Sequence, residues 1–383
     1  MSCGARRSMT RAAELAPALL RRCTGAIDTA ASAGHAAGHD VLSAAAPSVA
    51  RISTLQRRPD NAHSAIMQDG VPSARLGLRR KSTGGGPGDL RASLLHCVDI
   101  VRNNDLENWL WVGSLPKDMQ PQVVTLRALA TEIARIVDTV TEPGLASLRF
   151  QWWRERIAAA LDPPGAESNT PGGAHPVLTA LAAVHAKHPL TQMWLQRIVR
   201  TREAEAADPR PPADMDTLQA FAQGAHASLL TLQLEACGEA SHEAEHAASH
   251  IGTAVGMSLL LRGTLAHAKA RRCYLPSDVC ANLGLSTEDI YRGRANPELL
   301  ASAAFEVSKV AHAHLNEGLG IARALPKRAR LLLLPAVPAR LALAKLEKVN
   351  FDVTSPELQR GMGGINPLSL QAKLTWARLT GSL

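Results

Sequence analysis

Apolar residues recur at helical spacing through most of the chain after residue 89, and no segment of useful length alternates with the period of two typical of a strand. Leu94, Leu95, Val98 and Val101 begin this pattern, and a longer run at 124–140 continues it. Aromatic residues make up only 3% of the chain and Ala and Leu dominate it, which favours helices over sheets. Because about 290 residues share this pattern, most of the helices must be buried on more than one face. We expect one all-α domain.

Proline and glycine divide the helical pattern into segments. Pro116 and Pro121 precede the long helix expected up to Val140, and Pro143-Gly144 ends it. A Pro/Gly-rich loop is expected at 162–173 and a break at 208–212. Further helices are expected over residues 145–161, 176–206 (as a pair), 215–237, 242–270, 298–324 and 328–349.

The first 88 residues differ in composition from the rest and are expected to lie outside the folded domain. Glu14 is the one early acid among five arginines that alternate with Ala and Leu: Arg6, Arg7, Arg11, Arg21 and Arg22. A basic, amphipathic, acid-poor segment is typical of an organelle transit peptide, and a disordered tail without a targeting role is the alternative. Residues 81–88, KSTGGGPG, favour a flexible linker. We therefore divide the chain into a transit-like presequence with linker, 1–88, and a helical domain, 89–383.

The positive charge of the chain belongs mostly to this N-terminal segment. The formal net charge is +8, and residues 1–90 hold 12 Lys or Arg against 6 Asp or Glu, a net +6, which leaves +2 for the rest. A nucleic-acid partner is therefore not expected for the folded part. The 6 cysteines form no Cys-x-x-Cys pair, which favours reduced thiols over a disulfide framework. The chain contains no run of 18 or more apolar residues, so no transmembrane helix is predicted.

Four segments together resemble a known enzyme family. They are ALATEIARIVDTV (128–140), RFQWWRERI (149–157), ASHIGTAVGMSLLLR (248–262) and SLLLRGTLAHAKARRCYLP (258–276). In this order they resemble the first aspartate-motif helix, the Trp-Trp-Arg helix, the glycine-containing helix and the second aspartate-motif helix of the squalene and phytoene synthases. The resemblance extends over about residues 94–383 and implies an isoprenoid-synthase-like helical bundle.

The resemblance also exposes a loss of acids. In the family each motif carries two aspartates four residues apart, on one helix face, and the two pairs hold magnesium ions that bind a prenyl diphosphate. Here the first motif falls on Ala134 and Asp138 and the second on Gly263 and His267, so one carboxylate of four remains. Glu132 lies on a different face from Asp138 and does not replace the missing acids. Glycine and imidazole are poor magnesium ligands. Loss of the metal cluster removes stabilisation of the transition state, and each ~1.4 kcal/mol removed lowers the rate tenfold. We expect no catalytic residue, metal or cofactor, and Asp138 is equally consistent with a surface or packing role.

This pattern of loss resembles one branch of the superfamily, the mitochondrial complex I assembly factor 6 family. Further matches are HAASHIG (246–252), LTQMWLQRIVRTRE (190–203), SLLTLQLEACG (228–238) and VNFDVTSPELQ (349–359). The resemblance implies a non-catalytic protein on the matrix side of the mitochondrial inner membrane, in peripheral contact with it. Its implied partners are complex I subunits or other assembly factors. The alternative is an active squalene/phytoene-type prenyltransferase that uses farnesyl or geranylgeranyl diphosphate.

Two other constellations offer alternatives. His242, Glu243 and His246 match the His-Glu-x-x-His pattern of zinc peptidases, although the next acid after His246 is Asp278, just past Pro276. A polar first turn of the helix is the other interpretation. Second, three arginines lie near the missing acids and predict an anion- or lipid-binding site, for an anionic or prenyl lipid: Arg262, Arg271 and Arg272. Cations at a solvated helix end are the alternative.

The tryptophans and one leucine-rich segment complete the expectations. Most tryptophans are expected to line the core or a groove: Trp109, Trp111, Trp152, Trp153 and Trp194. The segment 328–340 mixes leucine with arginine, and predicts either contact with a membrane surface or an ordinary amphipathic core helix.

Overall fold

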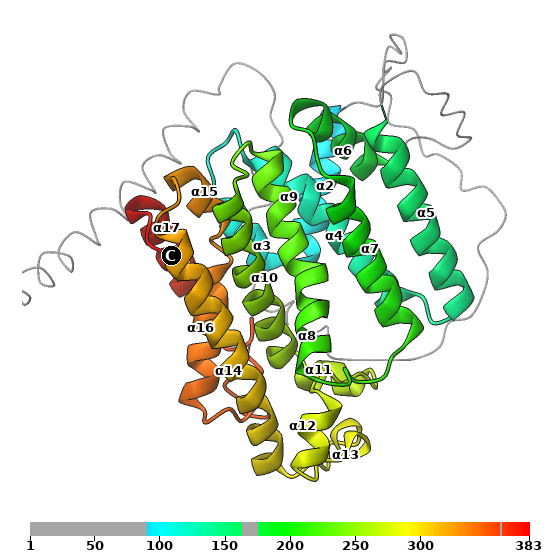
Figure 1. The fold of residues 1–383 in the computed structure, drawn as a ribbon, viewed down its shortest axis with the longest axis vertical. Coiled ribbons are helices and arrows are strands. Elements are labelled where there is room, and N and C mark those ends of the chain that lie inside the picture. Colours follow the sequence, from blue (N-terminus) through cyan, green and yellow to red (C-terminus); the bar gives the residue numbers. More distant parts are fainter. Residues whose placement is uncertain (1–89, 163–174, 361) are drawn as a thin grey trace, which may run out of the picture. The chain divides into compact units, whose positions relative to one another are not determined.

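The computed structural model describes residues 90–162, 175–360 and 362–383. Within them the chain is helical, and the only β-type pairing is an isolated bridge between Met362 and Ile365. The all-α prediction is confirmed (Figure 1). The expected presequence and linker, 1–88, and all but the first residue of the expected loop at 162–173 lie outside the described residues.

The helices follow one another through short connections. The first six are α2 (Leu90–Asn104), α3 (Leu106–Val112), α4 (Gln120–Thr139), α5 (Pro143–Leu161), α6 (Pro176–Lys187) and α7 (Gln192–Ala207). Next come α8 (Met215–Ala222), the π-helix η3 (Gln223–Ala227), α9 (Ser228–Ala236), α10 (His242–Arg262) and α11 (Thr264–Lys269). The last are α12 (Ser277–Asn282), α13 (Thr287–Tyr291), α14 (Pro297–Ala322), α15 (Lys327–Leu332), α16 (Ala336–Lys348) and α17 (Pro367–Thr380).

Every helix expected from the apolar spacing is present, with three corrections. The segment 215–237 is divided by η3, the segment 242–270 is interrupted at Gly263, and the segment 328–349 is interrupted before Ala336. Pro335 precedes Ala336 and begins the new helix, because its fixed φ suits the first turn but it cannot donate a hydrogen bond within the preceding one. The helices α3, α12, α13 and α17 were not expected from the sequence.

Helix α10 is the centre of the helical unit. It packs against α8, η3 and α9 on one side and against α14 and α16 on another (Figure 1). Apolar and small residues surround it on most faces, so it buries far more than one stripe, which is typical of a helix inside a large core. The close approach depends on glycine: a Cβ at Gly252 would lie 2.3 Å from the Ala227 Cα of η3.

The leucine-rich segment around α15 belongs to the core. The four leucines from Leu331 to Leu334 are 0–5% exposed. The interpretation of 328–340 as a membrane-contacting surface is therefore wrong, because its apolar side chains face the protein interior. No helix in the described part of the chain is long and apolar enough to cross a membrane.

His226 gives the fold a calculable pH dependence. Burial lowers the pKa of its imidazole to about 3, and Arg202 and Arg127 act in the same direction. The unfolded imidazole titrates near 6.5, so below that pH the unfolded chain binds a proton that the folded chain excludes. Stability is therefore lost as pH falls through 6.5. We expect this residue alone to lower the free energy of unfolding by about 2 kcal/mol between pH 7 and pH 5. Urea titrations at both pH values measure it, and His226→Gln should flatten the dependence; equal slopes for variant and wild type would contradict this origin.

Candidate functional site

Asp138, the one acid at the predicted motif positions, lies in the last turn of α4 and is paired with an arginine. Its carboxylate accepts a hydrogen bond of 2.8 Å from Nη1 of Arg272, and Nη2 of the same arginine donates to the Val137 carbonyl at 2.5 Å. The Asp138 side chain is 68% exposed and that of Arg272 23%. Asp138 therefore joins α4 to the segment after α11, and its negative charge is balanced by a cation of the protein itself.

At the predicted second motif, the side chain of His267 fills the space beside Gly263. Gly263 separates α10 from α11, and His267 lies one turn later in α11. A Cβ at Gly263 would lie 2.3 Å from Cε1 of His267, so the imidazole occupies the space that an aspartate at 263 would need. Burial lowers the pKa of His267, which favours the neutral ring. Gly263 and His267, the two positions predicted for this motif, thus pack against each other.

An aromatic and ionic network continues from His267. Its ring packs edge-on against Tyr274, with centroids 4.7 Å apart, and the Tyr274 hydroxyl donates to Glu205. Burial, with Glu205 adding to it, raises the pKa of that phenol. Glu205 also accepts from Arg202 at 2.8 Å, and the Arg202 guanidinium lies over the Phe221 ring at 5.1 Å. Side chains from α7, α8 and α11 therefore meet beside the motif positions.

These contacts decide what the motif face can do chemically. A magnesium cluster needs several oxygen ligands, and the four motif positions offer the single carboxylate of Asp138, held by Arg272. Among the described residues no group of three or more His, Cys, Asp or Glu side chains is arranged to hold a metal ion. Ala134 supplies no ligand, and Glu132 faces a different pocket on α4.

The three arginines predicted to bind an anion each have a carboxylate partner. Arg262 contacts Glu107 at 2.8 Å, and its side chain is 10% exposed. Arg271 contacts Glu288 at 3.0 Å, while Arg272 pairs with Asp138. An incoming anion would have to displace these carboxylates or share the arginines with them. The anion site stays a prediction.

The histidines of the zinc-peptidase pattern belong to a column on α10. The His242 and His246 rings have centroids 6.4 Å apart, and His246 is followed by His250 at 5.0 Å. Nδ1 of His250 lies 3.0 Å from Nδ1 of His314 on α14, whose Nε2 lies 2.7 Å from Oε1 of Gln219. If Nε2 of His314 donates to that oxygen, Nδ1 of His314 accepts from His250. The column therefore joins α10, α14 and α8 by hydrogen bonds.

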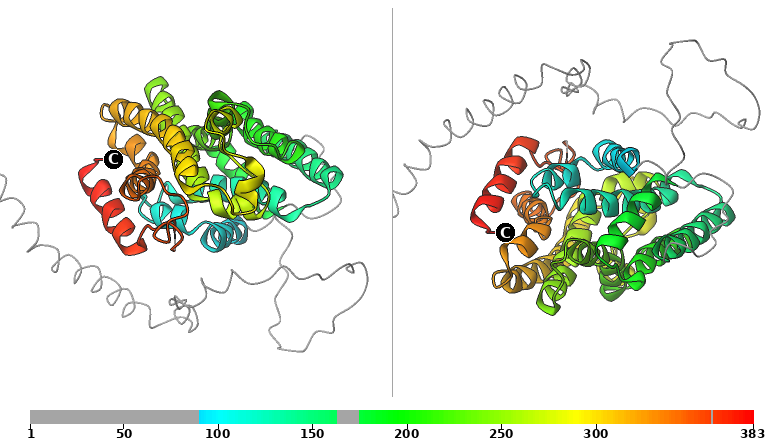
Figure 2. Two further views of the ribbon diagram at one scale, coloured as in Figure 1. Left: turned by 90° about the horizontal axis from the view of Figure 1, so that it is seen from below. Right: turned by 90° about the horizontal axis from the view of Figure 1, so that it is seen from above.

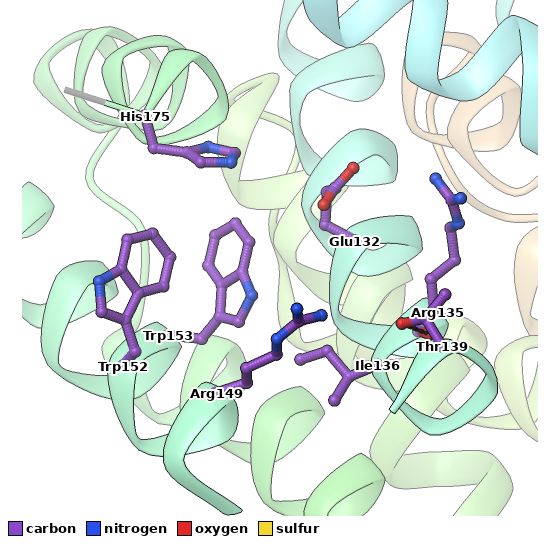
Figure 3. Close-up of a pocket in the computed structure, with 8 residues that line it drawn as sticks. All are labelled: Glu132, Arg135, Ile136, Thr139, Arg149, Trp152, Trp153 and His175. Carbon is purple, nitrogen blue, oxygen red and sulfur yellow. Dashed lines mark hydrogen bonds between the residues drawn. The ribbon is translucent and has the colours of Figure 1, made fainter. Parts of the chain in front are cut away.

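A pocket opens on the side of α4 away from the aspartate motif. It has a volume of about 420 Å³ between α4, α5 and the first residue before α6 (Figure 3). Glu132, Arg135, Ile136 and Thr139 share one face of α4, because they are spaced by three and four residues. Arg149, Trp152 and Trp153 of α5 face them, and His175 closes one end (Figure 3). Sequence reasoning placed Glu132 off the motif face but did not identify this pocket.

Aromatic rings form one wall of the pocket. Trp152 and Trp153 pack edge to face at 5.1 Å, and His175 lies 5.8 and 5.1 Å from them. Trp153 is buried, whereas Trp152 is 38% exposed. Burial lowers the pKa of His175, opposed by Glu132, and its buried Nδ1 has no hydrogen-bond partner among the described residues. The wall can therefore accept both an apolar group and a hydrogen-bond donor or acceptor.

A second pocket continues from the first along α5. It shares Thr139, Arg149 and Trp152 with the first and adds Leu145 and Leu148, which are 56% and 62% exposed. The two pockets form a continuous α4–α5 groove. Leu145, Leu148 and Trp152 stand at spacings of three and four, so α5 presents a second apolar stripe besides the one it buries. This duplicated stripe is the sequence signal by which the groove could have been found.

Comparison with known proteins supports the helical fold and shows the family. The squalene/phytoene synthase family model matches residues 101–375. A crystal structure of a dehydrosqualene synthase has the same fold, with a TM-score of 0.62 and 15% identity, covering 76% of this chain and 98% of that one. The squalene synthase HpnC from Alicyclobacillus acidocaldarius gives a TM-score of 0.59 and 17% identity, over 69% and 96% of the two chains.

Sequence relatives are more similar than these structures and have a different name. NADH dehydrogenase (ubiquinone) complex I, assembly factor 6 from Mus musculus is 33% identical over 302 residues, 78% of this chain and 87% of the relative. The Homo sapiens protein of that name is 31% identical over 306 residues, 79% and 88% of the two chains. The fold is that of the squalene synthases. The chain belongs to the squalene/phytoene synthase family and, within it, to the group of complex I assembly factor 6 proteins.

Proposed function

We propose that this chain is a non-catalytic assembly factor for mitochondrial NADH dehydrogenase, respiratory complex I. The observation that carries the proposal is the pairing of Asp138 with Arg272 on a face that has lost the other three motif acids. A prenyl synthase uses that face to hold magnesium, and here its one carboxylate is bound to a cation. The names of the relatives at 31–33% identity support the role in complex I assembly.

The proposal includes a location and partners. The chain acts on the matrix side of the mitochondrial inner membrane, in peripheral contact with it, and binds complex I subunits or other assembly factors. A transit-like segment at 1–88 supports import. An anionic or prenyl lipid is a further ligand, and its binding at Arg262, Arg271 and Arg272 requires exchange of the carboxylates that those arginines now hold.

The α4–α5 groove is the partner site in this proposal. Its exposed leucines and indole suit apolar side chains of a partner segment. Charges of both signs line it: Glu132 and Glu142 lie beside Arg135 and Arg149, and none of the four has an ion pair with another described residue. Mixed charges fit a polypeptide that carries both signs better than they fit an anionic lipid surface.

Incubation with farnesyl or geranylgeranyl diphosphate and Mg²⁺ separates this function from prenyl transfer. We expect no product above the background without protein, because the motif face offers one carboxylate where a magnesium cluster needs several. A squalene synthase assayed in parallel is the positive control. Turnover by this chain above background would overturn the non-catalytic proposal.

Rescue of complex I in the organism tests the assembly role. Loss of the protein should lower the level and activity of complex I, and Asp138→Asn should restore both. This substitution removes an exposed ion pair worth about 1 kcal/mol or less, so the fold should tolerate it. Complex I is measured by native gel and by NADH oxidation in isolated mitochondria. An unchanged complex I after loss of the protein would contradict the assembly role.

A further inference from the structure

Helix α17 carries two apolar faces on opposite sides. Leu370, Leu374 and Ala377 are buried. The helix packs against α3 and α16. A second set, Leu368, Trp376 and Leu379, is 77%, 63% and 62% exposed. At about 100° per residue the exposed set falls within about 80° of the helix circumference, nearly opposite the buried set. Figure 2 shows α17 at the margin of the helical unit in both views.

The charges on α17 are of one sign. Lys373 and Arg378 lie on the two flanks between the apolar faces, and the helix contains no Asp or Glu. Both are exposed, and neither has an ion pair with another described residue. More cations approach its C-terminal end: Lys327 donates to the Leu379 carbonyl at 3.4 Å, and Arg340 to the Leu383 carbonyl at 2.9 Å.

We infer that the outer face of α17 docks on an anionic membrane surface. An apolar face with an indole, flanked on both sides by cations, is the arrangement by which a helix lies in the headgroup region of a bilayer. The flanking cations then meet anionic headgroups, and their aliphatic stems cover apolar surface. The inference rests on the proposed peripheral contact with the inner membrane and names the surface that makes it.

The pattern of charge favours a membrane over a protein at this face. The α4–α5 groove is concave and lined by both signs of charge, whereas α17 is a helix exterior that itself carries cations and no acid. A surface of one sign is complementary to a surface of uniformly opposite charge.

Vesicle sedimentation with the purified full-length chain tests the inference. We expect wild type to bind vesicles of phosphatidylcholine mixed with phosphatidylglycerol at least about tenfold more strongly than vesicles of phosphatidylcholine alone, with loss of binding at high salt. Trp376→Ser with Leu379→Ser should weaken binding at least about tenfold. Lys373→Glu with Arg378→Glu should do so as well, since each lost cation is worth roughly fivefold before reversal.

A matched variant on α7 provides the control. Met193 is 58% exposed and Arg200 is exposed with no ion pair among the described residues, so Met193→Ser with Arg200→Glu changes similar surface elsewhere. This variant should sediment like wild type. Sedimentation of both α17 variants at the wild-type level would overturn the inference, as would a wild type that binds neither vesicle. Rescue of complex I is scored separately, so docking can fail while the assembly role holds, or the reverse.

Discussion

Gly252→Val is expected to lower the free energy of unfolding strongly. A Cβ at this position would lie 2.3 Å from the Ala227 Cα and 2.6 Å from its backbone nitrogen, so η3 itself must move away from α10. Because α10 packs on α8, α9, α14 and α16 as well, the displacement opens the centre of the core. Overpacking ordinarily costs 1–3 kcal/mol, and where backbone must shift we expect at least about 3 kcal/mol. That is a large share of a stability of about 5–15 kcal/mol. Urea unfolding followed by circular dichroism measures the loss.

Gly320→Ala is the matched control for that substitution. Gly320 also lies inside a long helix, α14, but a Cβ there meets nothing within 4 Å. It should therefore stabilise the protein by up to about 1 kcal/mol, the difference in helix propensity. An unfolding midpoint of Gly252→Val equal to that of wild type would contradict the close packing of α10 on η3.

The sequence predicts the helices better than it predicts their interruptions. The segment 242–270 has continuous helical spacing, yet α10 ends at Arg262 and α11 begins at Thr264. Gly263 has φ −82°, an ordinary value, so its identity is explained by the His267 ring against it and not by backbone conformation. A contact across the break is invisible in a linear pattern.

The π-helix η3 has a similar origin in tertiary packing. A Cβ at Gly224 would lie 2.1 Å from Oγ1 of Thr201 on α7, and Ala227 of η3 lies against Gly252 of α10. The extra residue of a π-turn changes which side chains face these neighbours, and local propensity does not reveal it. The helix pattern at 215–237 therefore predicts the presence of helix and misses its division.

In the candidate site, too, some features are predicted from the sequence and others depend on the fold. The loss of acids at Ala134, Gly263 and His267 is a prediction from the sequence, because the resemblance to the synthase motifs implies where carboxylates would stand. The partner of Asp138 is not, since Arg272 follows 134 residues later and is brought near by the fold. Helix α17 was missed because its two apolar faces cancel the one-sided periodicity by which a surface helix is found.

Substitution of the exposed groove residues should abolish assembly without unfolding the protein. Leu148→Ser with Trp152→Ser removes the apolar surface of the α4–α5 groove that is offered to a partner, and both side chains are substantially exposed. We expect complex I to fall to the level found without the protein, because truncation of central apolar anchors commonly costs an interface 2 kcal/mol or more. The thermal midpoint should fall by only a few degrees, because both side chains are substantially exposed. The small fall reflects the contacts of Trp152 with Trp153 and His175. Native gels and thermal unfolding measure the two effects.

The groove variant and Asp138→Asn together distinguish a partner-binding protein from a prenyltransferase. Met193→Ser, with similar exposure on α7, should restore complex I and serves as the surface control. A partner-binding protein predicts that Asp138→Asn restores complex I and that the groove variant fails. A prenyltransferase acting through its motif face predicts failure of Asp138→Asn, because the last metal-binding carboxylate is gone. Full rescue by the groove variant would remove the α4–α5 groove as the partner site and leave the assembly role to another surface.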